Sequence, residues 1–215
     1  MEDNRSTRKR TAIMEAAAAA FLENGFLGTN MDQIATAASV SKQTIYKHFS
    51  DKEQLFTEII HDTMGRVIGE LVRGATLAVR DSDDVERDLL ALARQLIASI
   101  WQPDVLRLRR LVIGEAGRFP HLGEAYFKQG FEAGVAAVAT SIEQLAAEHR
   151  LQVDDPQLAA QHFAGLILWV PVNRAMFTGS DKPAPDLDQF AKAGVRAFLA
   201  AYAPTDRRRT AKPAR

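Results

Sequence analysis

Apolar residues recur at helical spacing along almost the whole chain, and no stretch shows the alternation of apolar and polar residues that is typical of a strand. Near the N-terminus, for example, Ile13, Ala17, Ala20 and Phe21 fall on one face of a helix. This pattern restricts the chain to the all-α fold class. Farther along, proline and capping acids divide it into helices predicted at about 84–101, 104–117, 121–149, 156–178 and 186–203.

Small polar residues that can cap a helix mark four helix starts within residues 1–60. In chain order these are Ser6 or Thr7, Asn30, Ser41, and Ser50 or Asp51. Gln33 stands three residues after Asn30, as in a capping box, and Gly25 is expected to end the first helix. The pattern predicts a three-helix N-terminal domain that a long fourth helix joins to a larger helical domain.

The segment MDQIATAASVSKQTIYKHF, residues 31–49, has the pattern helix, tight turn, helix. With Ser41 as the cap, Val40 and Ile45 can form a hydrophobic staple, and Ile45 and Phe49 face the preceding helices. The opposite face then carries amide, hydroxyl, phenol and ammonium groups, which can bond to base edges and phosphate oxygens. The segment therefore predicts a helix-turn-helix whose recognition helix is residues 42–49.

An ordinary solvated face on a short surface helix is the alternative interpretation. It does not account for the coincidence of the helix pair, the aromatic and basic face, Lys52 at the next helix start and the basic arm NRSTRKR. DNA binding explains this combination better. The arm by itself is equally consistent with an arbitrary solvated N-terminus and with an extension that follows phosphates.

Residues 8–60 resemble the DNA-binding domain of the TetR/AcrR family of bacterial transcriptional regulators. The resemblance rests on AAAAAFLENGFLGTNMDQIATAASVSKQTIYKHFSDKEQLF, an ungapped stretch. The segment LRRLVIGEAGRFPHLGEAYFKQG is similar to the C-terminal domain of the AefR-like branch. The resemblance implies an all-helical homodimer. Its last two long helices would form a four-helix bundle between subunits, and each subunit would bind a small effector.

The resemblance also implies which residues contact DNA. On the recognition helix these are Lys42, Gln43, Thr44, Tyr46, Lys47 and His48. Thr29, Asn30 and Lys52 would contact phosphates. Residues 1–60 nevertheless contain seven Lys and Arg against eight Asp and Glu, so this domain is not basic overall. We therefore expect binding to depend on positioned groups and on two subunits, with a modest salt dependence.

We predict a flexible basic arm at residues 1–10, the DNA-binding domain at 11–56, an effector-binding and dimerisation domain at 57–203, and a disordered basic tail at 204–215. Large apolar residues and a few polar ones are the candidates for the effector pocket. They are Trp101, Phe119, Phe127, Phe131, His162, Trp169, Asn173 and Phe177. The apolar inventory favours a hydrophobic or aromatic effector.

The composition excludes several other classes. A formal net charge of 0 excludes a globally basic nucleic-acid coat, and the absence of cysteine excludes disulfides and thiolate metal sites. The longest apolar run, FAGLILWVPV, is too short to span a bilayer, so we expect a soluble, cytoplasmic and nucleoid-associated protein that does not bind membranes. Glu58 and His61 have the spacing of half a di-metal site, but no second copy follows, and we expect no metal, no cofactor and no catalytic residues.

The sequence thus predicts a ligand-responsive repressor, not an enzyme, that binds a near-palindromic double-stranded operator as a homodimer and is released by a small effector. Two alternatives stay open at this point. An all-helical enzyme would have to use the scattered groups Glu115, Glu124, His121 and His162. A non-specific architectural DNA binder is the other, although neutral charge and the large second domain speak against it.

Overall fold

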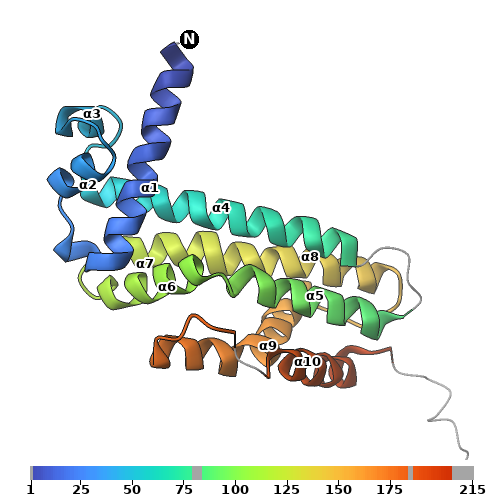
Figure 1. The fold of residues 1–215 in the computed structure, drawn as a ribbon. Helices are drawn as coiled ribbons and strands as arrows, with labels where there is room; N and C mark the ends of the chain where they lie inside the picture. The colour runs from blue at the N-terminus through green and yellow to red at the C-terminus, as the bar shows by residue number, and fades with distance from the viewer. Residues whose placement is uncertain (1, 79–83, 184–185, 205–215) are drawn as a thin grey trace, which may run out of the picture. The chain divides into compact units, whose positions relative to one another are not determined.

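The computed structural model describes residues 2–78, 84–183 and 186–204, and all regular elements in these ranges are helices (Figure 1). This confirms the predicted all-α fold class. Of the predicted basic tail, all but Pro204 lies outside the described residues. Within these ranges no helix is both long and apolar enough to cross a membrane.

The helices pack into two compact units. The first comprises residues 1–67 and 102–131, and the second residues 68–101 and 132–215. The first unit contains α1 (Glu2–Gly28), α2 (Met31–Ala37), α3 (Lys42–Tyr46), the start of α4 (Lys52–Ala78), α6 (Pro103–Glu115) and α7 (Pro120–Tyr126). The second contains the end of α4, α5 (Val85–Ile100), α8 (Ala133–Ala147), α9 (Pro156–Thr178) and α10 (Leu187–Tyr202). Packing thus divides the chain differently from the predicted functional domains, which remain predictions.

The core of the first unit explains why α6 and α7 belong to it. Phe21 and Phe26 of α1 pack against Phe56 of α4, with ring centroids 5.0 and 5.3 Å from that of Phe56. Phe119, just before α7, packs edge-on against Phe26 at 4.8 Å. Residues of α6 and α7 complete the same buried cluster: Val105, Leu108, Val112 and Leu122. The helix-turn-helix is therefore built on a scaffold that includes residues from the middle of the chain.

The first helix differs from its prediction at one end and agrees at the other. It is helical from Glu2, so Ser6 and Thr7 do not cap it, while the flexibility of the arm stays a prediction. The physical reason is that no proline or glycine interrupts this stretch, and that Arg10 is held by Glu58 of α4 at 2.7 Å. At the other end Gly25 leaves the helical conformation, with φ of 76°, as expected.

The single helix predicted at 121–149 is in fact three consecutive segments. A π-helical turn, Phe127–Glu132, separates α7 from α8. Gly130 lies in this turn, and a β-carbon there would come within 2.8 Å of the Met64 sulfur of α4. A larger residue at position 130 would therefore require the Met64 side chain to shift, a constraint that apolar periodicity does not reveal.

In the second unit α9 packs between α8 and α10 and contributes Phe163, whose ring meets Phe198 of α10 edge-on at 5.1 Å. The buried Asp88 of α5 accepts a hydrogen bond from Arg150 at 2.6 Å, and this bond raises the pKa of the Arg150 guanidinium. Although α9 is apolar nearly all round, one face of it stays uncovered. Its exposed apolar residues are Leu158, Leu166, Trp169, Val170 and Phe177.

Candidate nucleic-acid interface

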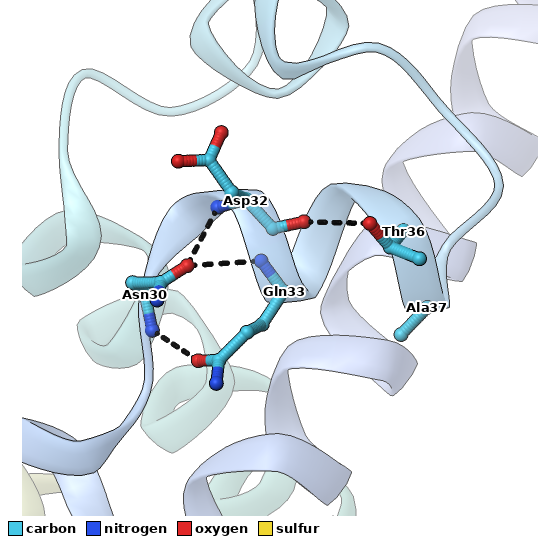
Figure 2. Close-up of a pocket in the computed structure, with 5 residues that line it drawn as sticks. All are labelled: Asn30, Asp32, Gln33, Thr36 and Ala37. Carbon is cyan, nitrogen blue, oxygen red and sulfur yellow. Dashed lines mark hydrogen bonds between the residues drawn. The ribbon is translucent and has the colours of Figure 1, made fainter.

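The second helix begins at a closed capping box. The Asn30 side-chain oxygen accepts hydrogen bonds from the backbone N–H groups of Asp32 and Gln33, both at 3.0 Å. In return the Gln33 side chain accepts from the Asn30 N–H at 2.8 Å (Figure 2). This confirms the predicted cap. The N-terminus of α2 is thereby held in one conformation by residues that are adjacent in sequence.

The turn between α2 and α3 is a Schellman motif. The Val40 N–H donates to the Ala35 carbonyl at 3.0 Å, and the Ser39 N–H donates to the Thr36 carbonyl at 3.1 Å. Ser39 takes the left-handed conformation, with φ of 53°, that this motif needs. The motif satisfies the last carbonyls of α2 and sets the direction in which the chain enters α3.

The third helix is held by one cap and two buried side chains. Ser41 accepts from the Thr44 N–H at 3.1 Å, which confirms the predicted cap. Ile45 and the following Phe49 are both buried, and Val40 packs against the same core. The helix itself ends at Tyr46, earlier than predicted, and residues 47–49 continue as a hydrogen-bonded turn.

The outward face of this short helix is polar and accessible. Gln43, Tyr46 and Lys47 are exposed, with Tyr46 48% exposed in spite of its large apolar ring. Thr44 and His48 are half-buried, and the Thr44 hydroxyl lies 2.8 Å from that of Ser41. The structure thus places the predicted recognition-helix residues together. The Thr44 hydroxyl is partly engaged, because it lies within hydrogen-bond distance of the capping Ser41 hydroxyl.

Two of the predicted phosphate contacts, Thr29 and Lys52, have side chains that are bonded to backbone carbonyls of the protein itself. Thr29 is only 1% exposed, and its hydroxyl donates to the carbonyls of Ala20 and Gly25 at 3.0 and 2.9 Å. The Thr29 hydroxyl is therefore bonded to the end of α1, and its contact with phosphate stays a prediction. The reason is that the kink at Gly25 leaves carbonyls that need a donor, and Thr29 supplies one.

Lys52 is also turned inward. Its ammonium donates to the carbonyls of Phe26 and Thr29, each at 2.7 Å, and lies 4.5 Å from the centre of the Phe26 ring. Burial lowers the pKa of this ammonium below its ordinary value. The geometry gives Lys52 a positioning role for the α1–α2 connection, and the direct phosphate contact stays a prediction.

An open hollow of about 520 Å³ lies along the outer face of α2 (Figure 2). Its lining is Asn30, Asp32, Gln33, Thr36 and Ala37. Four of these five residues are polar, and Asp32 is the charged one. The hollow is open to solvent and does not enclose a ligand-sized space. Sequence reasoning missed Asp32, although its place in the first turn of α2 makes it a neighbour of the α2 cap.

The effector-pocket candidates belong to both units and differ in burial. Phe119 belongs to the core of the first unit, and Phe127 stacks on Phe131 at 5.0 Å with both rings largely exposed. On α9, Trp169 and Phe177 are 71% and 89% exposed.

The remaining candidates lie in the second unit. His162 lies 2.6 Å from the Tyr202 hydroxyl, Asn173 donates to the Trp169 carbonyl at 2.7 Å, and Trp101 packs against the core. The Trp101 indole N–H is buried and has no hydrogen-bond partner among the residues that the structure describes. The eight residues therefore divide between core positions and exposed faces. The sequence did not predict this division, because apolar side chains occur in both kinds of position.

The titratable groups that could suggest an enzyme or a metal site are paired elsewhere. Glu58 binds Arg10, while His61 lies 2.8 Å from the Gln129 side chain, so this pair does not act together. His121 lies 3.0 Å from Glu53. Among the residues that the structure describes, no group of three or more His, Asp or Glu is placed to hold a metal ion.

Comparison with known proteins identifies the family on which this geometry is built. Residues 13–59 match the family of bacterial regulatory proteins of the tetR type. Residues 87–204, more than half of the 215-residue chain, match the C-terminal domain of AefR-like transcriptional repressors.

Individual relatives agree over nearly their full lengths. A TetR-family transcriptional regulator from Mesorhizobium loti MAFF303099 is 44% identical, with a TM-score of 0.87 over 93% of this chain and 99% of that one. The flavonoid-responsive regulator FrrA is 31% identical, with a TM-score of 0.74 over 92% and 98%. The HTH-type transcriptional regulator YhgD of Bacillus subtilis (strain 168) is 28% identical over 88% of this chain and 93% of its own. The chain therefore belongs to the TetR family of bacterial transcriptional regulators, with an AefR-like C-terminal domain.

Proposed function

We propose that this protein is a ligand-responsive transcriptional repressor that binds a near-palindromic operator as a homodimer and is released by a small effector. The observation that carries the proposal is the outward face of α3, where Gln43, Tyr46 and Lys47 are exposed while Ile45 and Phe49 anchor the helix in the core. The match to AefR-like repressors favours repression over activation. The mechanism needs no catalytic group, so we propose no enzymatic activity.

In this proposal the residues of the helix-turn-helix have separate roles. Gln43 and Lys47 would read base edges in the major groove, since an amide can pair with adenine and an ammonium can reach guanine. Tyr46 and His48 would donate to phosphates. Asn30 would present the N-terminus of α2 to the backbone. Lys42 and the methyl group of Thr44 would complete the surface.

Two copies of the chain would associate through the uncovered face of α9. The exposed apolar residues on this helix recur at positions 158, 166, 169, 170 and 177, which follow one side of a helix. An apolar face of this length is unusual on an isolated chain, and a twofold pairing of α9 and α10 would bury it in a four-helix bundle. The dimer would then offer two recognition helices to successive major grooves.

The effector is proposed to be a small hydrophobic or aromatic molecule. The relative FrrA is named as flavonoid-responsive, which supports an aromatic compound in particular. Because a ligand shifts an equilibrium only through its differential affinity, the effector must bind the DNA-free conformation more tightly than the DNA-bound one.

Selection of bound fragments from genomic DNA tests the proposal. The wild type is expected to enrich a small number of near-palindromic fragments, and Tyr46→Ala with Lys47→Ala is expected to lose them while folding normally. Lys182→Ala, an exposed lysine in the second unit, serves as the matched control and should retain the wild-type fragments. Unchanged enrichment by the Tyr46 and Lys47 variant would refute the proposed DNA surface.

A further inference from the structure

Lys42, the first residue of α3, is already paired on the protein surface. Its ammonium donates to the carboxylate of Asp32 on α2 at 2.9 Å, across the turn of the helix-turn-helix. Both side chains are accessible, with 48% of Lys42 and 70% of Asp32 exposed. The hydrogen bond to Asp32 raises the pKa of the Lys42 ammonium. A residue that would be expected to meet DNA therefore has a competing partner in the free protein.

The surroundings of Asp32 give its carboxylate no other bonded partner among the described residues. Asn30 and Gln33 use their side chains in the capping box, and Thr36 donates to the Asp32 main-chain carbonyl at 3.0 Å. Figure 2 shows the Asp32 carboxylate directed away from the side chains of the capping box, and Asp32 is one of the residues that line the hollow along α2. The same carboxylate that holds Lys42 thus also presents negative charge where a DNA backbone would approach.

We propose that Asp32 is a specificity-determining residue that withholds Lys42 from DNA of arbitrary sequence. This inference rests on the proposed DNA-binding function and concerns the same surface. On non-specific DNA, Lys42 stays with Asp32 and does not neutralise a phosphate. On the operator, contacts from Gln43 and Lys47 hold the backbone close enough for a phosphate to displace the carboxylate.

The weakness of exposed ion pairs makes this exchange possible. An exposed ion pair of this kind contributes little free energy. A positioned phosphate can therefore replace Asp32 as the partner of Lys42 at small energetic cost. Non-specific binding, in contrast, consists almost entirely of phosphate neutralisation, so the loss of one cation per subunit reduces it directly. The ratio of specific to non-specific affinity rises as a result.

The test uses the full-length protein, a duplex of random sequence and a titration with salt. Asp32→Asn keeps the shape of the side chain and removes its charge. It is expected to bind this duplex roughly three- to fivefold more tightly per subunit than the wild type. Its plot of log affinity against log salt should steepen by about 0.9 per subunit, as for one additional phosphate.

Two further variants separate the proposed cause from general effects of charge. Glu23→Gln removes one exposed carboxylate from α1 of the same unit and should leave the affinity and the slope unchanged. In a Lys42→Gln background, Asp32→Asn should lose its effect, because the lysine that it releases is absent. Circular dichroism and thermal melting confirm that every variant folds.

The outcomes are distinguishable. Equal affinity and slope for the wild type and Asp32→Asn would overturn the inference while leaving the proposed function intact. A full effect of Asp32→Asn in the Lys42→Gln background would overturn it as well, since Asp32 would then act without Lys42. Failure of the folded wild type to bind the duplex even at low salt would instead refute DNA binding itself.

Discussion

The ammonium of Lys52 lies 2.7 Å from the carbonyl oxygen of Thr29 and donates a hydrogen bond to it. A second bond of equal length reaches the Phe26 carbonyl, so one side chain at the start of α4 holds both ends of the α1–α2 connection. The cap at Asn30 follows directly after this connection. The position of α2, and with it that of the helix-turn-helix, therefore depends on a lysine that points into the protein.

Replacing Lys52 with methionine is expected to lower the free energy of unfolding by about 1–3 kcal/mol, because two carbonyls lose a charged donor. Chemical denaturation measures the effect. Lys47→Met is the matched control: Lys47 is exposed on the outward side of α3, so this variant should keep its stability and lose DNA affinity. Equal stability of both variants would show that Lys52 has no positioning role.

Replacing Ser39 with glycine is expected to stabilise the protein by about 0.5–1 kcal/mol, because Ser39 occupies the left-handed region at φ of 53°. Ser39→Val should lower stability instead, since a β-branched side chain is strained there. Equilibrium unfolding in urea compares the two variants with the wild type. A loss of stability in Ser39→Gly would contradict the assigned Schellman motif.

Replacing Trp169 and Phe177 with glutamate is expected to convert the proposed dimer into monomers, because charge on an apolar interface cannot be solvated. Analytical ultracentrifugation measures the change, and affinity for the operator should fall with it. Leu77→Glu is the control, since Leu77 is a large exposed apolar residue on α4, outside the α9 face. A Trp169 and Phe177 variant that stays dimeric would place the interface elsewhere.

The carboxylate of Asp188 on α10 is expected to make the stability of the fold depend on pH under acidic conditions. Hydrogen bonds from Lys192, and next from Arg94 of α5 at 2.7 and 3.0 Å, lower the pKa of the Asp188 carboxyl below its ordinary value. Because the folded-state pKa is the lower one, Asp188 stabilises the fold above its unfolded-state pKa. This contribution is lost as the pH falls through the folded-state pKa.

Asp188→Asn should therefore be less stable than the wild type at neutral pH, with the difference shrinking under strongly acidic conditions. Thermal melting across this range measures it. A difference that stays constant with pH would show that the carboxylate charge is not responsible.

Local sequence predicted much of the fold and the candidate site, and it did so where the chemistry is local. The capping box of Asn30 with Gln33 and the cap of Ser41 on Thr44 join residues three positions apart. The left-handed break at Gly25 follows from glycine itself. These features need no knowledge of the rest of the chain, because the groups that satisfy each other are adjacent.

The sequence could not predict the side-chain partners where residues far apart in the chain compete for one group. Thr29 and Lys52 have the residue types of phosphate contacts, but carbonyls nine and 26 positions away engage their side chains. Lys42 meets Asp32 ten positions earlier. A pattern of residue types identifies donors and acceptors without identifying which of them are already engaged.

The sequence by itself determined that this chain is all-helical, where most of its helices begin, and that it carries a helix-turn-helix of the TetR type. The helices and their starts depend on periodicity and on caps, which act within one turn of a helix, whereas the TetR type follows from the resemblance of residues 8–60 to that family. Only the tertiary structure decided that Lys52 points inward and that Lys42 is held by Asp32. The physical reason is that hydrogen-bond partners and burial are assigned by packing between helices, which brings together residues that the linear sequence keeps apart.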